Sequence, residues 1–220
     1  MSASVAPRRG LSLRANFSWT FVGNAVNEGA WWGMTVLLAQ LGSPEHVGRF
    51  ALGLAATAPV FMFATLRLRD VQATDVRDEY SFGDYLALRM TTTALAFLTV
   101  VGIAFLSNYP PEASWVIVAM GVSKGIEAIS DGFYGLFMKH ERLDRIAKSM
   151  MLKGPLALVG LGVGFALTGS VFWGAMGLVV ARAVVMLAYD TRNAAATLGP
   201  AGMRPRWNRR VLVRLAWAAL

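Results

Sequence analysis

The sequence predicts an all-α fold, a polytopic membrane helix bundle, and three observations support this prediction. Of the 220 residues, 55% are hydrophobic and only 15% are charged, whereas a soluble domain carries about 25% charged residues. Residues 90–111 and 154–181 contain no Asp, Glu, Lys or Arg, and each stretch exceeds the about 20 residues that a helix needs to cross a bilayer. Basic residues concentrate between alternate apolar segments.

The apolar segments predict six transmembrane helices and the start of a seventh. They lie at residues 15–40, 47–66, 84–106, 113–138, 150–168 and 171–190, with the seventh beginning at 211–220. Glu28 is the only charge in the first segment. Ser43-Pro44-Glu45 precedes the second helix and supplies an N-cap residue, a proline at the first helical position and an acid in the first turn. Ser81 and Asp84 are spaced as in a capping box, which predicts where the third helix begins.

The later helices are separated by turn residues. Asn108-Tyr109-Pro110-Pro111-Glu112 ends the third helix and begins the fourth, because proline cannot continue a helix. The apolar run 150–189 would form a single helix of about 60 Å, twice the thickness of the hydrocarbon core. It is therefore predicted to cross twice, with Thr168-Gly169-Ser170 as the turn.

The positive charges predict the topology. Seventeen of the 21 Lys and Arg residues lie before the first helix or after the second, fourth and sixth. By the positive-inside rule, the N-terminus is cytoplasmic. The chain then divides into a cytoplasmic N-terminus (1–14), a six-helix lobe (15–192), a basic cytoplasmic linker (193–210) and the truncated seventh helix (211–220). The connections 67–83 and 139–149 are predicted to be cytoplasmic, the second either as a solvated loop or as an interfacial helix built on Leu143, Ile146 and Met150.

Composition excludes several kinds of chemistry. There is no cysteine, and His46 and His140 are the only histidines, so disulfides, Cys-bound zinc, thiol nucleophiles and a histidine-based site are not expected. No loop gathers acid, base and metal-ligand groups, so we expect no enzyme, metal or cofactor. The net charge of +8 is explained by the basic residues that the positive-inside rule places in the cytoplasmic segments. A nucleic-acid partner is therefore not expected.

Ionisable residues inside the predicted helices are the candidate functional residues, because they are costly in lipid. Lys124, Glu127 and Asp131 share one face of the fourth helix, since residues three and four apart are neighbours on a helix. Glu28 lies near the midplane on the first helix beside Asn24, Asn27 and Trp31, and Arg182 lies at similar depth on the sixth. Two interpretations are open. The charges are structural ion pairs, Lys124 with Glu127 and Glu28 with Arg182, or they line a substrate or ion path.

Three passages carry a family resemblance. They are Leu38-Ala-Gln-Leu-Gly-Ser-Pro-Glu-His-Val-Gly-Arg-Phe-Ala-Leu52, Leu66-Arg-Leu-Arg-Asp-Val-Gln-Ala-Thr-Asp75 and Phe82-Gly-Asp-Tyr-Leu-Ala-Leu-Arg89. This pattern resembles the polysaccharide transporter family, the O-antigen and capsule flippases of the multidrug/oligosaccharidyl-lipid/polysaccharide exporter superfamily. In that family a Leu-Gly-Pro-Glu-like turn ends the first helix and Gly-x-Phe-Ala enters the second. The resemblance covers most of residues 15–195.

The resemblance implies the N-terminal lobe of a two-lobed transporter in the bacterial cytoplasmic (inner) membrane. Such a transporter flips a polyprenyl-pyrophosphate-linked oligosaccharide for synthesis of lipopolysaccharide or another surface polysaccharide. It implies that Lys124 and Arg182 serve the pyrophosphate and that Asn24, Asn27 and Trp31 face the sugars. Glu28, Glu127 or Asp131 would couple a proton or sodium ion to transport.

The length predicts an incomplete transporter. Six helices and the start of a seventh correspond to one lobe, so the chain is a fragment, a truncated gene product or a half-transporter, and we expect a fragment. Its expected partners are membrane lipid, the lipid-linked oligosaccharide and a missing C-terminal lobe or a second copy. The alternative is a non-transporting membrane partner of a glycan export or polymerisation complex.

Overall fold

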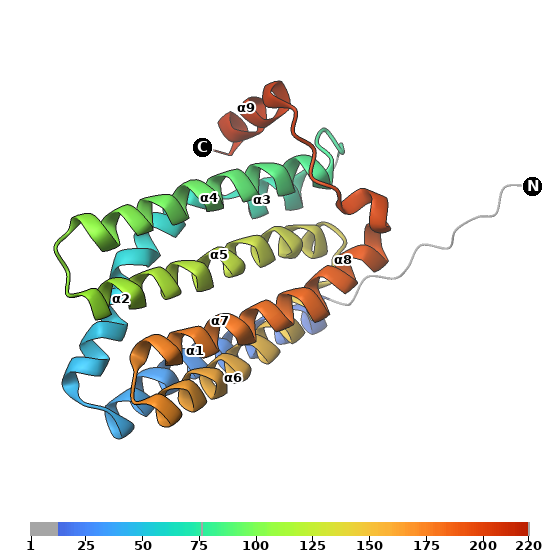
Figure 1. Cartoon of the computed structure of the whole chain (residues 1–220). Helices are drawn as coiled ribbons and strands as arrows, with labels where there is room; N and C mark the ends of the chain where they lie inside the picture. The colour runs from blue at the N-terminus through green and yellow to red at the C-terminus, as the bar shows by residue number, and fades with distance from the viewer. Residues whose placement is uncertain (1–12, 76, 220) are drawn as a thin grey trace, which may run out of the picture.

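The computed structural model describes residues 13–75 and 77–219, which form a helical bundle without a β-strand (Figure 1). The α-helices are α1 (Leu13–Leu41), α2 (Pro44–Ala64), α3 (Leu68–Thr74), α4 (Phe82–Leu106), α5 (Pro111–Lys139), α6 (Leu143–Thr168), α7 (Val171–Val185), α8 (Thr191–Leu198) and α9 (Arg209–Ala218). A π-helical segment, η1 (Met186–Asp190), joins α7 to α8, and a 3₁₀ turn, η2 (Pro200–Met203), follows α8. The all-α prediction is confirmed for the described chain.

Helix α5 lies in the middle of the bundle. In Figure 1 it runs between α4, with α2 and α3, on one side and α1, α6 and α7 on the other. It is also the most deeply buried of the long apolar helices in the described chain. Each of the three charged networks described below includes a side chain of α5.

Five helical segments of the described chain are long and apolar enough to cross a membrane. They are Pro44–Thr74, Phe82–Leu106, Pro111–Lys139, Leu143–Thr168 and Val171–Leu198. Large apolar side chains such as Phe63, Leu98 and Leu167 point outward on them and are highly exposed. An extended apolar surface of this kind suits lipid and not water. The protein is therefore a multi-pass membrane protein.

The predicted count of six crossings plus the start of a seventh is not supported by these segments. Helix α1 has 29 residues but is not among the five segments, because polar side chains such as Asn24, Asn27 and Glu28 lower its mean hydropathy. Helix α9 has ten residues, about 15 Å of helix, and carries three arginines. The cytoplasmic position of the N-terminus is likewise not supported, and residues 1–12 of the predicted 1–14 segment lie outside the described chain.

Helix α6 corrects the prediction for residues 139–149. It begins at Leu143 instead of at residue 150, so residues 143–149 form neither a solvated loop nor a separate interfacial helix. Ile146 and Ser149 are buried, because these first two turns pack against α5 and the chain that follows α7. The predicted helix 171–190 also differs, since it passes through η1 and continues to Leu198.

Short-range capping determines where two helices begin. The backbone N–H of Ser81 donates to Asp84 Oδ2 over 2.9 Å, which confirms the predicted capping box of α4. At α2 the backbone N–H of Ser43 donates to His46 Nδ1 over 3.0 Å. A histidine thus takes the place that Glu or Gln usually holds in this motif.

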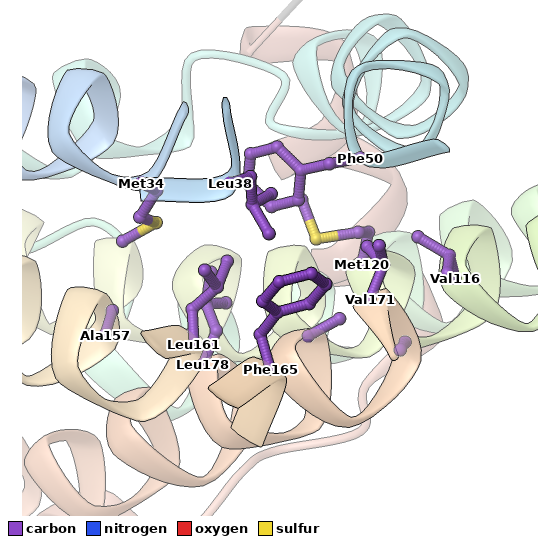
Figure 2. Packing of buried hydrophobic residues seen from close by; sticks show 12 residues of the cluster. Met34, Leu38, Phe50, Val116, Met120, Ala157, Leu161, Phe165, Val171 and Leu178 are labelled. Atoms are coloured by element: carbon purple, nitrogen blue, oxygen red, sulfur yellow. The ribbon is translucent and has the colours of Figure 1, made fainter. Parts of the chain in front are cut away.

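One apolar cluster joins the outer helices to α5. Figure 2 shows Met34 and Leu38 of α1 facing Leu161 and Phe165 of α6. Phe50 of α2 and the α5 residues Val116 and Met120 belong to the same cluster, and all are almost fully buried. This packing holds α1 on the α6–α7 pair and secures the start of α2.

Asp75 organises the connection between α3 and α4. Its carboxylate accepts hydrogen bonds from the backbone N–H groups of Glu79 and Tyr80 and from the Tyr85 hydroxyl. Burial opposes its ionisation, but the two backbone hydrogen bonds and the nearby Lys139 ammonium outweigh burial and hold the pKa of Asp75 below its usual value. Its stabilising contribution is therefore full above the unfolded-state pKa of about 3.9 and is lost as pH falls through the lower folded-state value.

Glycines set the distance between α6 and α7. A Cβ atom at Gly160 would collide with the backbone of Gly177, and one at Gly164 would collide with the backbone of Trp173. The two helix backbones therefore touch directly, as in other small-xxx-small pairs of membrane helices. The four-residue spacing of Gly160 and Gly164 places both glycines on the face of α6 that meets α7.

We expect Gly160→Ala to lower the free energy of unfolding by about 1–3 kcal/mol, because the added methyl group forces the two backbones apart. Denaturant unfolding in detergent micelles, followed by circular dichroism, measures this change. Gly102→Ala is the matched control, since a Cβ at Gly102 of α4 meets no atom within 4 Å. An equal response of the two variants would contradict the close α6–α7 contact.

Candidate functional site

One face of α5 carries a row of polar and charged side chains. Lys124, Glu127, Asp131 and Tyr134 are spaced by three, four and three residues, so they form a single row along the helix. Each of them contacts a polar or charged side chain from another helix, or from its own row. The row therefore passes through three contact networks along the length of α5.

The first network is centred on the Glu127 carboxylate. Its Oε2 atom lies 3.0 Å from Lys124 Nζ and 3.1 Å from Arg182 Nη1. Arg182 Nη1 also donates to Ser123 Oγ over 2.8 Å, and the Arg182 side chain is only 5% exposed. One acid thus faces two cations, which leaves this network with an excess positive charge.

Trp31 of α1 completes the first network. Its ring centroid lies 4.8 Å from Arg182 Cζ and 5.2 Å from Lys124 Nζ, both within the range of cation–π attraction. The excess positive charge therefore rests against an aromatic face as well as against Glu127. Through these contacts α1, α5 and α7 meet at one point.

Two adjoining cavities lie on this side of α5, and together we call them the α1–α2 groove. The first, of 540 Å³, is lined by Asn27, Glu28, Trp31, Trp32, Thr35, Leu54, Lys124 and Glu127. The second, of 410 Å³, is lined by Ala58, Phe61, Met62, Thr65, Arg67, Arg69, Asp70, Lys124, Glu127, Ala128 and Asp131. Lys124 and Glu127 line both, so α5 forms the floor and α1 and α2 the walls. Amide, indole, ammonium and carboxylate groups converge in this groove.

The second network holds Asp131 between two arginines. Arg69 Nη1 lies 3.1 Å from Oδ1, and Arg89 Nη2 lies 2.9 Å from Oδ2. Arg89 also donates to the Thr65 backbone carbonyl over 3.1 Å and is 1% exposed. Asp131 thus ties α5 to α3 and α4. Because Arg69 lines the α1–α2 groove, this network forms one end of it.

The third network is buried away from the groove. Lys153 of α6 lies 2.6 Å from Asp190 Oδ2 of η1, and the two residues are 6% and 0% exposed. Lys153 also donates to the Tyr134 hydroxyl over 2.9 Å, and that hydroxyl is 2.8 Å from Ser149 Oγ. Asp190 sits at the end of the π-helical segment. This network fixes α6 and η1 to α5.

The predicted site residues separate into those that the fold brings together and those that it does not. Trp31, Lys124, Glu127 and Arg182 meet in the first network, and Asn27 and Glu28 line the groove beside them. Asp131 lies in the second network, and Asn24 instead bonds to the Thr20 carbonyl on the exposed side of α1.

Of the two predicted ion pairs, one forms. Lys124 pairs with Glu127 as expected. The Glu28–Arg182 pair does not form, because Arg182 pairs with Glu127, while Glu28 accepts a hydrogen bond from Asn27 Nδ2 over 3.2 Å.

Sequence reasoning missed three buried charged residues, Arg89, Lys153 and Asp190. Arg89 and Lys153 fall within the predicted helices 84–106 and 150–168 but were not singled out as candidate residues, and in the structure both are buried in α4 and α6. Lys153 and Asp190 are 37 residues apart, so no helical periodicity relates them. The only sequence signal for these residues is weaker than helical periodicity. Each residue borders a long apolar stretch, where an unpaired charge is costly.

Metal ligands do not cluster in the described part of the chain. Within residues 13–75 and 77–219, no group of three or more His, Asp or Glu side chains is placed to hold a metal ion. The groups that converge in the α1–α2 groove suit ionic and hydrogen-bonding contacts with a polar ligand.

The helices and the groove define a multi-pass membrane protein whose interior carries paired charges and a polar cavity. The chain is similar to the capsular polysaccharide biosynthesis protein CapF of Staphylococcus aureus, with 28% identity over 144 residues. This similarity covers 66% of the present chain and 35% of CapF, so the chain spans about a third of that relative. No protein-family model matches the chain, and no solved structure is significantly similar to it.

We expect Asp190→Asn to lower the free energy of unfolding by about 3–5 kcal/mol, because it leaves the buried Lys153 ammonium uncompensated. The double variant Lys153→Met with Asp190→Leu should recover most of this loss, since it removes both charges. Thermal and denaturant unfolding in detergent micelles measure both effects.

The control for this prediction is Asp70→Asn. Asp70 pairs with Arg67 over 3.4 Å on the exposed surface, where an ion pair contributes at most about 1 kcal/mol. A loss of similar size in Asp70→Asn and Asp190→Asn would contradict the special role of the buried pair.

Proposed function

We propose that this chain is the N-terminal lobe of a transporter that flips a polyprenyl-pyrophosphate-linked oligosaccharide across the bacterial cytoplasmic membrane. The observation that carries the proposal is the α1–α2 groove, where Lys124 lies among Asn27, Trp31 and Glu127. The distant similarity to a capsular polysaccharide biosynthesis protein supports a role in surface polysaccharide synthesis. In this proposal α1 also crosses the membrane, and the N-terminus is cytoplasmic.

The groove offers a distinct contact to each part of such a substrate. The Lys124 side chain is 21% exposed and its ammonium meets the pyrophosphate, while Asn27 and Trp31 meet sugar hydroxyls and sugar ring faces. Arg182 is a positioning residue, since its guanidinium is buried against Glu127, Ser123 and Trp31. Arg182 pairs with Glu127, so the Lys124 ammonium keeps N–H groups that can donate hydrogen bonds to the substrate.

Coupling to an ion is proposed at the acids of the groove. Glu28, Glu127 and Asp131 line the two cavities, and Asp131 already has two arginine partners. Binding of a proton or sodium ion at one of these carboxylates would weaken its ion pairs and free a helix to move against α5. The second lobe of the transporter would be supplied by a further part of the same protein or by a second copy.

The test is the amount of surface glycan in cells that depend on this protein. We expect Lys124→Ala to lower exported glycan at least about tenfold, which corresponds to about 1.4 kcal/mol of lost substrate contact, with a normal amount of protein in the membrane. The matched control is Lys139→Ala. Lys139 lies on the same helix with a similar side-chain exposure of 19%, but it pairs with Asp78 and does not line the groove.

A different result would contradict the proposal. Undiminished surface glycan in cells that carry Lys124→Ala, Arg182→Ala and Asp131→Asn together would exclude a transport role for the groove. The alternative, a non-transporting partner of a glycan export or polymerisation complex, predicts that result. It also predicts that the coding sequence stops soon after the codon for Leu220, whereas a two-lobed transporter requires an open reading frame or a second copy.

A further inference from the structure

The segment after η1 is exclusively basic. Residues 191–219 contain Arg192, Arg204, Arg206, Arg209, Arg210 and Arg214 and no acidic residue. Three of these arginines lie on α9, which packs beside α4 in Figure 1. A short helix with this composition needs an anionic partner or water on its charged side.

The inner face of α9 is apolar and docks on the bundle. Leu215 is fully buried and Ala219 is 5% exposed, in a cluster with Leu68, Tyr85 and Leu88. The chain before α9 is also held to α4. The backbone N–H of Arg206 donates to the Gly83 carbonyl over 3.0 Å. The orientation of α9 is therefore determined by its contacts with α3 and α4.

The outer face of α9 combines arginines with a tryptophan. Val213 and Arg214 lie three and four residues after Arg210, and Trp217 lies four and three residues after them, so the four share one face of the helix. All four are exposed, Trp217 to 75%. Within the described chain, Arg209, Arg210 and Arg214 form no ion pair within 4.0 Å. Unpaired arginines beside an exposed tryptophan are typical of a surface at a membrane interface.

The part of α4 on which α9 packs determines how deep α9 lies in the membrane. Tyr85 and Leu88 lie three and six residues from Phe82, about 5 and 9 Å along α4. Helix α4 has 25 residues, about 37 Å, which exceeds the hydrocarbon thickness of about 30 Å. Its first turns therefore reach the headgroup layer, and α9, packed against those turns, lies at the same level.

We infer that α9 is an interfacial helix whose outer face, Arg210–Val213–Arg214–Trp217, binds anionic phospholipid headgroups. The guanidinium groups pair with lipid phosphates, and the Trp217 indole lies at the boundary between headgroups and acyl chains. This contact holds the basic segment that follows η1 against the bundle. The inference depends on α4 spanning the membrane and is independent of what the groove transports.

Because the 220 residues contain no cysteine, Val213→Cys introduces a thiol that is unique within them. The protein is placed in nanodiscs of phosphatidylcholine or of phosphatidylcholine with about 30% phosphatidylglycerol, an anionic lipid. The rate of thiol modification by a neutral, water-soluble maleimide is then measured. We expect slower modification in the anionic nanodiscs and recovery of the rate in 1 M salt, where the Debye length falls to about 3 Å.

Substituting Arg210→Gln and Arg214→Gln in the Val213→Cys protein should remove most of this protection. A basic residue near an anionic surface contributes about fivefold to binding, so the pair contributes about 25-fold. The matched control is Ser107→Cys, an exposed position at the far end of α4, whose modification rate should not depend on lipid charge.

Two results would overturn the inference. Rapid modification of Val213→Cys in both kinds of nanodisc would show that α9 does not bind the lipid surface. Slow modification in both, unchanged by salt and by the arginine substitutions, would show that residues 211–219 are inserted in the hydrocarbon core, as a transmembrane helix would be. Loss of glycan export in Lys124→Ala cells has no bearing on either result.

Discussion

The Glu127 carboxylate, shared by Lys124 and Arg182, is the interaction on which the arrangement of the bundle depends. An unpaired charge inside a membrane-spanning helix is costly, so α5 must be surrounded by helices that supply opposite charges. Arg182 brings α7 to Glu127, and Trp31 of α1 packs against both cations. The same requirement recurs at Asp131, which brings in α3 and α4. Pairing of charges along one face of α5 therefore determines which helices become its neighbours.

The α1–α2 groove follows from this arrangement. The α1, α6 and α7 helices are held together by an apolar cluster and by glycine contacts between α6 and α7, whereas α2, α3 and α4 pack on the opposite side of α5. Helices α1 and α2 are joined by a short turn at Ser43, and the two cavities lie along the part of α5 between them. The polar row of α5 is thus accessible on one side, where Lys124 and Glu127 line both cavities, and sealed on the other, where Lys153 and Asp190 are buried.

Local sequence signals predicted the helices well where the signal and the structure depend on the same few residues. The capping residues before α2 and α4 and the Thr168-Gly169-Ser170 turn are examples, since Gly169 has the positive φ that glycine tolerates most easily. The prediction failed at the beginning of α6. Polar residues 143–149 favour a loop by composition, but their apolar members pack on α5 and extend the helix.

The sequence by itself determined the class of the protein, the position of its long apolar helices and the row of polar residues on α5, because these properties arise from composition and from spacings of three and four residues. Only the tertiary structure decided which charges meet. Arg182 and Glu127 are 55 residues apart, and Lys153 and Asp190 are 37 apart, so their pairing depends on how whole helices pack. The expected Glu28–Arg182 pair failed for this reason: depth along each helix can be estimated from sequence, but the rotation of one helix relative to another cannot.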